Sequence, residues 1–415
     1  MKILMINNFS SILTGVESCL KAQTALLRAK GHEVYIFSTD KKPYINEVNE
    51  YTEFFPKYTQ YSALSTIEAL KYTLKSHYNL EAERNLSLML EKIRPDIAHA
   101  HNIIYHLSPS VLNACYKKHI PAVITLHGAD FICPGIRLML GGKKHCKDEL
   151  CKNNKAYNCF LNKCADGNLY RSIFASGEFY FRKSQRMYEK ISAYICPSQA
   201  LMELALRSGM KKEKLSLITN FADNNLLKNT PEYSNKGYFL YAGRLAKEKG
   251  IEYLLRAMYL VPKDLKLHLV GTGPFEAELK KLCLELELNN VYFMGFKSGK
   301  ELEEEYKNSI GVVLPSNSFE IFGLTLIEAY SWGKPVIASN IGGMPEVVDN
   351  NITGIVVEPE NIGQLADAMD LLYNNNQLVI NMGIKGRKKV ETIYNPEMHY
   401  SKLIKLYNLV IQAEK

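Results

Sequence analysis

Short apolar runs alternate with amphipathic stretches along most of the chain. The opening run KILMINN is followed by a loop, by a helical pattern over residues 17–30 that ends at Gly31, and by a second apolar run, VYIFS. This order predicts a strand, a helix and a second strand, the βαβ unit of a parallel sheet. Further strands are predicted at 96–101, 122–127, 192–199 and 214–220, with helices between them at 86–93 and 108–118.

The same alternation divides the chain into two domains. Residues 1–222 are predicted to form the first, and the polar segment 223–236, with four asparagines and a proline, is typical of a linker. The alternation then starts again and predicts a second domain of similar size over residues 237–395. A final helix over residues 396–415 is long enough to cross back to the first domain. The predicted fold class is α/β, with two doubly wound, Rossmann-like domains facing a cleft.

The loops that follow the strands of the second domain carry most of the candidate chemistry, because ligands bind at the carboxyl ends of such strands. Arg244 and Lys249 follow the run YFLYAG and suit a diphosphate, although two solvated cations near a helix start are the alternative. Glu320 and Glu328 would lie about 12 Å apart if both were helical, the span from a sugar to a ribose across a diphosphate. Glu320 alone could instead be a simple helix cap.

Two further places on the chain suggest ligand contacts. Backbone N–H groups at the helix start over 322–324 form a natural anion seat, and Gly323 permits close approach. The strand LKLHLVG runs into Gly271 and Gly273, but Glu276 occupies the third glycine position of a dinucleotide fingerprint, so that motif is absent. In the first domain, His127 ends the strand VITLH, where it is either a ligand contact or a structural hydrogen-bonding group.

The second half resembles the retaining glycosyltransferases of family 4, which have the GT-B architecture. The resemblance rests on FEIFGLTLIEAYSWGKPVIASNIGGMPEVVDNNITGIVVEP at 319–359, which contains an E-x7-E pattern. YAGRLAKEKGIEYLL, LVGTGP and VYFMGF support it. The family implies a nucleotide-diphosphate sugar as donor, no cofactor and no catalytic metal. One departure is Thr14-Gly15, where many relatives have a pair of glycines.

The resemblance also implies roles for individual residues. Arg244 and Lys249 bind the diphosphate, Glu328 binds the ribose hydroxyls, and Glu320 contacts the donor sugar beside His127. The implied catalytic residues are Glu320, Arg244, Lys249 and His127. The other implied donor-binding residues are Gly15, Gly271, Gly273, Phe296, Phe322, Gly323, Leu324 and Thr325.

These observations predict a retaining glycosyltransferase, of hexosyl or N-acetylhexosaminyl type, in surface polysaccharide or glycoconjugate synthesis. The acceptor is expected to be a glycan or a lipid-linked molecule. A sugar-nucleotide epimerase of the same architecture is one alternative, and a non-catalytic protein that binds a nucleotide sugar or nucleic acid is another. The four charged residues of the second domain argue against the non-catalytic alternative, and no nucleic-acid partner is expected.

Charge is unevenly distributed along a chain whose formal net charge is +8. Residues 1–235 contain 31 Lys and Arg against 21 Asp and Glu, whereas residues 236–415 contain 20 against 22. The first half is therefore expected to meet an anionic partner such as a membrane surface, with a solvated basic surface as the alternative. Because no apolar run approaches a membrane span, we expect a cytoplasmic protein, peripheral on the inner face of the membrane.

The first domain contains two unusual segments. A helical pattern over 168–191 carries aromatic residues at spacings of seven and is predicted to expose Arg182, Lys183, Arg186 and Lys190, a group suited to an anionic bilayer. Packing of that stripe against the sheet is the alternative. The other segment, an insertion over about 131–166, contains Cys133, Cys146, Cys151, Cys159 and Cys164. Free thiols, a zinc site and disulfides remain open for these five cysteines.

Overall fold

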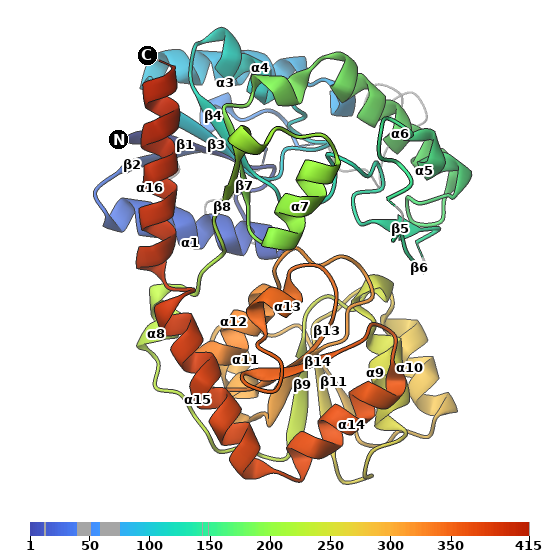
Figure 1. The fold of residues 1–415 in the computed structure, drawn as a ribbon. Coiled ribbons are helices and arrows are strands. Elements are labelled where there is room, and N and C mark those ends of the chain that lie inside the picture. Colours follow the sequence, from blue (N-terminus) through green and yellow to red (C-terminus); the bar gives the residue numbers. More distant parts are fainter. Residues whose placement is uncertain (12–13, 40–50, 59–74, 143, 148, 415) are drawn as a thin grey trace.

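The protein has two lobes, each built on a six-stranded parallel sheet (Figure 1). The computed structural model describes residues 1–11, 14–39, 51–58, 75–142, 144–147 and 149–414. The two sheets confirm the predicted fold class of two Rossmann-like α/β domains. No helix among the described residues is both long enough and apolar enough to span a bilayer.

The sheet of the first lobe has the strand order β2-β1-β3-β4-β7-β8. Its strands are β1 (Lys2–Ile6), β2 (Glu33–Phe37), β3 (Ile97–Ala100), β4 (Ala122–Thr125), β7 (Ala193–Cys196) and β8 (Leu215–Leu217). The helices of this lobe are α1 (Gly15–Ala29), α3 (Leu80–Ile93), α4 (Ser110–Lys117), α5 (Tyr157–Leu161), α6 (Leu169–Ser184) and α7 (Gln199–Arg207). A short hairpin of β5 (Met139–Leu140) and β6 (Lys144–His145) lies between β4 and α5.

Helices cover both faces of this sheet, because successive side chains of a strand point to opposite faces. In β1, Leu4 and Ile6 belong to a core shared with α3, α4 and α7. Ile3 and Met5 belong to a second core shared with α1 and with α16 (Pro396–Ala413). The last helix of the chain therefore crosses back and completes the first lobe, as the red helix of Figure 1 shows.

The sheet of the second lobe has the strand order β11-β10-β9-β12-β13-β14. Its strands are β9 (Tyr238–Ala242), β10 (Lys266–Val270), β11 (Val291–Gly295), β12 (Gly311–Leu314), β13 (Val336–Ser339) and β14 (Gly354–Val357). The helices of this lobe are α9 (Ile251–Met258), α10 (Glu276–Glu285), α11 (Gly299–Asn308), α12 (Leu324–Ser331), α13 (Met344–Val347), α14 (Ile362–Tyr373) and α15 (Asn376–Thr392).

The segment predicted to be a linker contains a helix of its own. Helix α8 spans Asn224–Lys228, and the side chain of Asp223 caps it by accepting a hydrogen bond from the Leu226 N–H at 2.9 Å. Asp223, in the segment that suggested a linker, thus caps a helix. Asp and Asn are frequent both at helix N-termini and in loops, so composition alone does not distinguish the two.

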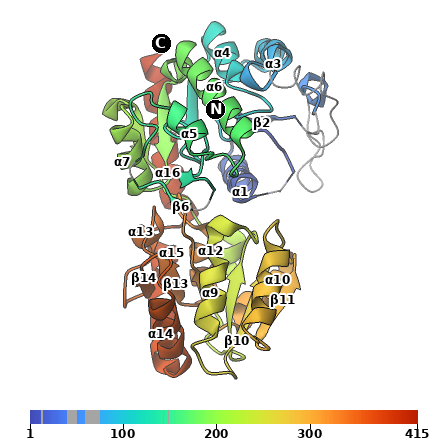
Figure 2. The ribbon, with the colours of Figure 1, turned by 90° about the vertical axis from the view of Figure 1, so that its right-hand side faces the viewer.

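Several contacts fix the two lobes against each other next to the strand ends. The carboxylate of Glu346, in α13, accepts hydrogen bonds from the backbone N–H groups of Gln199 and Ala200 at 2.7 and 2.6 Å. It caps α7 of the other lobe, where a negative charge is favoured by the helix dipole. Beside it, a Cβ on Gly343 would lie 2.7 Å from the Cβ of Ser198, so only glycine fits this contact. Figure 2 shows α13 directly below α7.

Candidate active site

Lys249 and Glu320 form an ion pair at the carboxyl end of the second sheet. Lys249 ends a single turn of 3-10 helix, Lys247–Lys249, that follows β9, and Glu320 follows the neighbouring strand β12. The Lys249 Nζ lies 2.5 Å from Glu320 Oε1, and the Ser316 hydroxyl donates to the same oxygen at 2.8 Å. The structure therefore joins two predicted site residues that the sequence had placed on separate loops.

The Glu320 carboxylate is held in its ionised form. Burial alone would raise its pKa, but the charge of Lys249, the hydrogen bonds from Lys249 and Ser316, and the charge of Arg244 together lower it. The site consequently contains a stable carboxylate beside an ammonium group.

Arg244 lies in the same loop as Lys249 but has a different partner. Its guanidinium forms an ion pair with Glu248, and the same carboxylate lies 3.5 Å from the guanidinium of Arg137. Arg137 comes from the cysteine-containing insertion of the first lobe, so this cluster spans the boundary between lobes. Both predicted diphosphate-binding cations thus have carboxylate partners here.

Glu328 lies apart from this cluster, in the second turn of α12. The Tyr306 hydroxyl donates a hydrogen bond to its Oε2 at 2.7 Å. Burial raises the pKa of Glu328, the Tyr306 hydrogen bond lowers it, and the nearby charge of Asp223 raises it, with a net increase. Glu328 and Tyr306 line a cavity of about 490 Å³ whose wall includes Ser18 and Lys21 of α1, so both lobes contribute to it.

The 12 Å separation estimated for the two glutamates does not apply. Helix α12 begins at Leu324, so Glu320 lies in the loop that precedes it and only Glu328 is helical. Backbone contacts fix the position of Glu320. The Gly343 N–H donates to the Glu320 carbonyl at 2.7 Å, and Gly342, at φ 61°, packs so closely that a Cβ would lie 2.0 Å from that oxygen.

The backbone N–H groups predicted to bind an anion, at the start of α12, face the first lobe. Gly323 precedes the helix at φ 88°, Phe322 is buried, and a Cβ on Gly15 would lie 3.3 Å from a methyl group of Leu324. Gly15 is the first residue of α1, so the N-termini of two helices from different lobes meet here. The hydroxyl of Thr325 donates to the Ala242 carbonyl at 3.5 Å, a long bond that ties the helix to the end of β9.

Gly271, Gly273 and Phe296 lie on loops farther along the same sheet edge. A Cβ on Gly271 would lie 1.9 Å from the carbonyl oxygen of Gly243, and one on Gly273 would lie 2.1 Å from that of Leu245. These glycines therefore pack against the loop that carries Arg244, which gives them a structural role. The Phe296 side chain is largely exposed after β11.

His127 is paired with a second histidine that the sequence analysis had not singled out. His101 Nδ1 lies 2.8 Å from His127 Nε2, and the two residues follow the adjacent parallel strands β3 and β4. Burial lowers the pKa of His127 to about 4 and holds the pKa of His101 well below its usual value, so both rings are neutral at neutral pH. They line a cavity of about 100 Å³, and His101 Nε2 is buried there without a hydrogen-bond partner. The two strand sequences IAHAH and VITLH both end in histidine, and this shared ending is the signal that could have revealed the pair.

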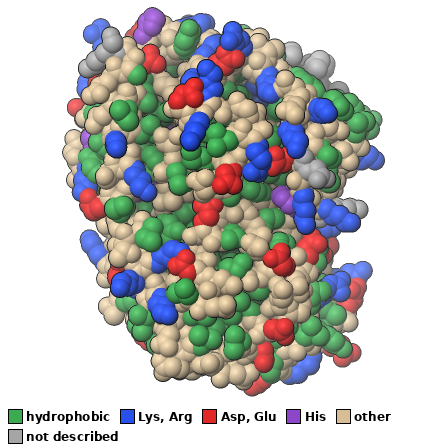
Figure 3. All heavy atoms as spheres, in the orientation of Figure 1, with side chains coloured by type: hydrophobic (Ala, Val, Ile, Leu, Met, Phe, Trp, Pro, Cys, Tyr) green, Lys and Arg blue, Asp and Glu red, His purple; other side chains and the backbone are tan. Residues whose placement is uncertain are grey.

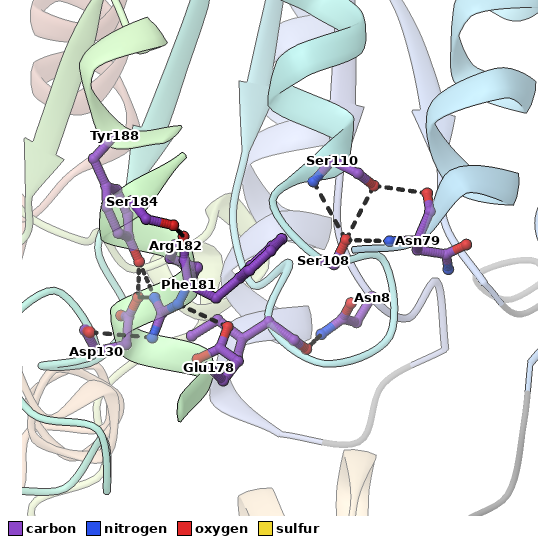
Figure 4. Close-up of polar contacts among 11 residues, drawn as sticks. Asn8, Asn79, Ser108, Ser110, Asp130, Glu178, Phe181, Arg182, Ser184 and Tyr188 are labelled. Atoms are coloured by element: carbon purple, nitrogen blue, oxygen red, sulfur yellow. Dashed lines mark hydrogen bonds and ion pairs between the residues drawn. The ribbon is translucent and has the colours of Figure 1, made fainter. Parts of the chain in front are cut away.

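Asp130 and Tyr188 line the same cavity and are held by a buried arginine (Figure 4). The Arg182 side chain, only 1% exposed, lies 3.2 Å from Asp130 Oδ2 and 2.7 Å from Glu178 Oε1. The Tyr188 hydroxyl donates to Asp130 at 2.8 Å. The prediction that Arg182 lies on a basic surface was therefore wrong, because Asp130 and Glu178 neutralise it inside the lobe.

All nine cysteines are buried free thiols, and none forms a disulfide. Within the described ranges, which include every cysteine, no group of three or more His, Cys, Asp or Glu side chains is arranged to hold a metal ion. The thiol of Cys159 donates to Cys164 and thereby lowers the pKa of Cys164 to about 7, against the effect of burial. Of the three alternatives for the cysteine cluster, free thiols agree with the structure.

Two family models cover most of the chain. The model described as Glycosyltransferase Family 4 matches residues 13–226, just over half of the chain, and the model described as Glycosyl transferases group 1 matches residues 223–389. The chain belongs to glycosyltransferase family 4. Lys249, Glu320 and Glu328 lie in the part matched by the group 1 model, whereas Gly15 and His127 lie in the part matched by the family 4 model.

This family 4 glycosyltransferase is 32% identical to an uncharacterized glycosyltransferase from Methanocaldococcus jannaschii, over 42% of this chain and 45% of that protein. It is 28% identical to the O-antigen chain mannosyltransferase C of Escherichia coli, over 43% of this chain and 48% of the mannosyltransferase. The chain thus spans less than half the length of these two relatives. HepE of Anabaena, solved with UDP and glucose, shares its fold, with a TM-score of 0.68, 18% identity and coverage of 98% of this chain and 99% of HepE.

Proposed function

We propose that this chain is a retaining glycosyltransferase that uses a nucleotide-diphosphate sugar. It would transfer a hexosyl or N-acetylhexosaminyl residue to a glycan or lipid-linked acceptor in surface polysaccharide or glycoconjugate synthesis. The observation that carries the proposal is the cluster of Lys249, Glu320 and Arg244 at the strand ends where the two lobes meet. The UDP bound to HepE and the O-antigen chemistry of the mannosyltransferase relative support the donor and acceptor classes.

In this proposal the cations of the second lobe hold the diphosphate. The donor would displace Glu248 from Arg244 and Glu320 from Lys249, so that each carboxylate exchanges an ion pair for a contact with solvent or sugar. Glu320, ionised and released from Lys249, would accept hydrogen bonds from sugar hydroxyls. Glu328 would accept hydrogen bonds from the ribose, and the neutral His127 would contact the sugar from the first lobe.

The proposed transfer takes place on one face of the sugar. The bond between the anomeric carbon and the phosphate oxygen breaks, and the developing positive charge on the sugar is balanced by the departing diphosphate. The acceptor oxygen then bonds to the same face, and its proton passes to the departing phosphate oxygen. Arg244 and Lys249 stabilise the negative charge that grows on the diphosphate, which is the largest electrostatic demand of the reaction.

The test is a panel of nucleotide-diphosphate sugars with lipid-linked and soluble glycan acceptors. We expect free nucleoside diphosphate to accumulate only when both substrates are present, and NMR of the product to show the anomeric configuration of the donor. A product of opposite configuration would exclude the retaining mechanism. An epimerised nucleotide sugar formed without an acceptor would favour the epimerase instead.

Chelation should not affect turnover. Because Arg244 and Lys249 are proposed to supply the positive charge at the diphosphate, no divalent cation is required there. Initial rates with and without EDTA, after exhaustive dialysis, are expected to agree. A rate restored only by added Mg²⁺ or Mn²⁺ would assign the diphosphate charge to a metal.

The Tyr306→Phe variant should change the pH dependence of donor binding. The Tyr306 hydroxyl lowers the pKa of Glu328, which burial raises, so removing the hydroxyl raises that pKa further. Glu328 then becomes protonated at a higher pH and loses the strong hydrogen bonds that a carboxylate accepts from ribose. We expect the acid-side loss of nucleoside diphosphate affinity to begin at higher pH in Tyr306→Phe than in the wild type. The exposed Tyr259→Phe is the control and should leave the profile unchanged.

A further inference from the structure

Helices α5 and α6 present a face of apolar and basic side chains that are exposed among the described residues. Leu161, Tyr170 and Ile173 are 64%, 82% and 49% exposed, and Tyr157 and Leu169 are also exposed beside them. We call these five residues, with the exposed Lys152, Lys155 and Lys163, the α5–α6 face. Figure 3 shows hydrophobic side chains together with Lys and Arg at the right-hand edge of the upper lobe, where Figure 1 places the two helices.

The two helices that carry the face are tied to each other. Helix α5 packs along α6, and the Tyr157 N–H donates to the Tyr180 hydroxyl at 3.2 Å while that hydroxyl donates to the Asn154 carbonyl at 2.8 Å. Leu169 and Ile173 lie four residues apart, on the same side of α6. Large exposed apolar residues that gather in this way mark interaction surfaces, whereas single ones are ordinary.

The exposed charges around the face are mainly positive. Between residues 152 and 186 the exposed basic side chains are Lys152, Lys155, Lys163, Arg171, Lys183 and Arg186, and Asp166 is the exposed acidic one. Asp166 is already paired with Arg137 and Arg171. Among the described residues, no ion pair joins Lys152, Lys155 or Lys163 to a carboxylate, so these three ammonium groups are available to an external anion.

The opposite side of α6 anchors the helix to the lobe. Phe179 is buried, and Arg182 binds Asp130 and Glu178 inside the protein (Figure 4). The helix therefore does not need its outer face for folding. At 1.5 Å per residue the 16 residues of α6 span about 24 Å, from the exposed Leu169 end to the Arg182 end that supports the Asp130–His127 cavity.

We propose that the α5–α6 face docks on the surface of an anionic lipid bilayer. Tyr157, Leu161, Tyr170 and Ile173 enter the interfacial region, and the lysines contact lipid phosphates. Amphipathic surfaces that combine aromatic and aliphatic residues with Lys lie in this way at the boundary of headgroups and acyl chains. A polyanionic glycan would use the lysines and leave the apolar residues in water, so the apolar half of the face favours the bilayer. Docking is separate from the proposed transfer chemistry, since it involves none of the donor-site residues.

The test is cosedimentation of the full chain with vesicles, in the absence of donor and acceptor. The wild type should bind phosphatidylcholine vesicles containing 30% phosphatidylglycerol, bind pure phosphatidylcholine weakly, and lose affinity as salt rises. Changing Lys152, Lys155 and Lys163 together to Gln should weaken binding on the order of 100-fold, since each cation near an anionic surface contributes roughly fivefold. The Leu161→Gln/Ile173→Gln variant should weaken it at least tenfold at unchanged charge.

Control variants that remove similar side chains elsewhere on the protein show whether vesicle binding depends on the α5–α6 face. Lys388, Lys402 and Lys405 are exposed lysines of α15 and α16, and their triple change to Gln removes the same charge elsewhere. Leu260, 59% exposed in the second lobe, is the apolar control when changed to Gln. Both controls should bind as the wild type does, and circular dichroism should show that every variant is folded.

Two outcomes would overturn the proposal. Vesicle binding that is equal in the wild type and in both α5–α6 variants would place the docking surface elsewhere or exclude it. Binding that falls with the lysine variant but not with the apolar variant would identify an anion-binding surface without membrane insertion. Because the assay contains no sugar nucleotide, either outcome leaves the proposed transferase activity to be judged by its own experiment.

Discussion

Replacing Lys249 with alanine should lower kcat by on the order of 10² to 10³. In the proposed mechanism this ammonium group moves from Glu320 to the departing diphosphate, and one preorganised electrostatic contact in a transition state contributes about 2.7–4 kcal/mol. The substitution also removes the strongest influence that lowers the pKa of Glu320, so the variant loses a charge at the diphosphate and part of the charge at the sugar contact. Steady-state kinetics with a saturating acceptor measure the change.

Lys247 provides a matched control for this prediction. It lies two residues earlier in the same 3-10 turn, and no ion pair within the described part of the chain joins it to a carboxylate. Lys247→Ala should keep kcat within about twofold of the wild type. If Lys249→Ala turned over as fast as Lys247→Ala, Lys249 would be a structural partner of Glu320 and would have no part in catalysis.

Replacing Arg182 with methionine should lower the free energy of unfolding by about 3–5 kcal/mol. The change leaves the carboxylates of Glu178 and Asp130 buried without their cation, and an uncompensated buried charge costs this much. Because Asp130 lines the cavity of His101 and His127, we also expect weaker activity in the fraction that folds. Chemical denaturation at neutral pH gives the stability.

A substitution of the neighbouring Lys183 distinguishes the effect of removing a positive charge from the effect of leaving buried carboxylates without a cation. Its side chain is exposed on the same helix, so Lys183→Met removes one positive charge and should change stability by no more than about 0.5 kcal/mol. The free energy of unfolding lost in Arg182→Met should also be smaller when Glu178 is changed to Gln in the same chain, because one of the two buried carboxylates is then replaced by a neutral amide. A loss below about 1 kcal/mol for Arg182→Met would show that the buried ion pairs contribute little.

The fold class could be predicted because parallel strands buried on both faces leave a strong pattern. The run GVVLP is apolar at every position, VITLH is interrupted only by Thr125 and His127, and helix-length amphipathic segments separate such runs. The same logic places loop residues at one edge of each sheet, so His127 and Lys249 could be assigned to strand ends from the sequence alone. Helix α8 was missed because its capping residues have the composition of a linker.

Pairing between distant segments could not be predicted from the pattern. Arg182 was predicted to lie on the surface because its spacing on α6 differs from that of the aromatic stripe. In the structure it is buried, where it contacts Asp130, which lies 52 positions earlier in the chain. Lys249 and Glu320 are 71 positions apart, and their 2.5 Å contact depends on the adjacency of β9 and β12. Sheet order decides such contacts, and a single sequence does not specify it.

Glu320 and Glu328 have different roles in this account, and a ligand without a sugar separates them. Glu328 is assigned to the ribose, so Glu328→Gln should weaken binding of the bare nucleoside diphosphate by roughly tenfold or more. Glu320 is assigned to the sugar and is paired with Lys249 in the unbound state, so Glu320→Gln releases that cation. The Glu320→Gln variant should bind the diphosphate at least as tightly as the wild type and yet lose turnover.

Calorimetric titration of the nucleoside diphosphate into the wild type, Glu320→Gln and Glu328→Gln therefore tests the donor site most directly. We expect undiminished affinity for Glu320→Gln and reduced affinity for Glu328→Gln, with turnover lost in Glu320→Gln. An equal loss of diphosphate affinity in both variants would contradict the assignment of Glu320 to the sugar. Glu320 would then act by positioning the backbone groups that bind the phosphates.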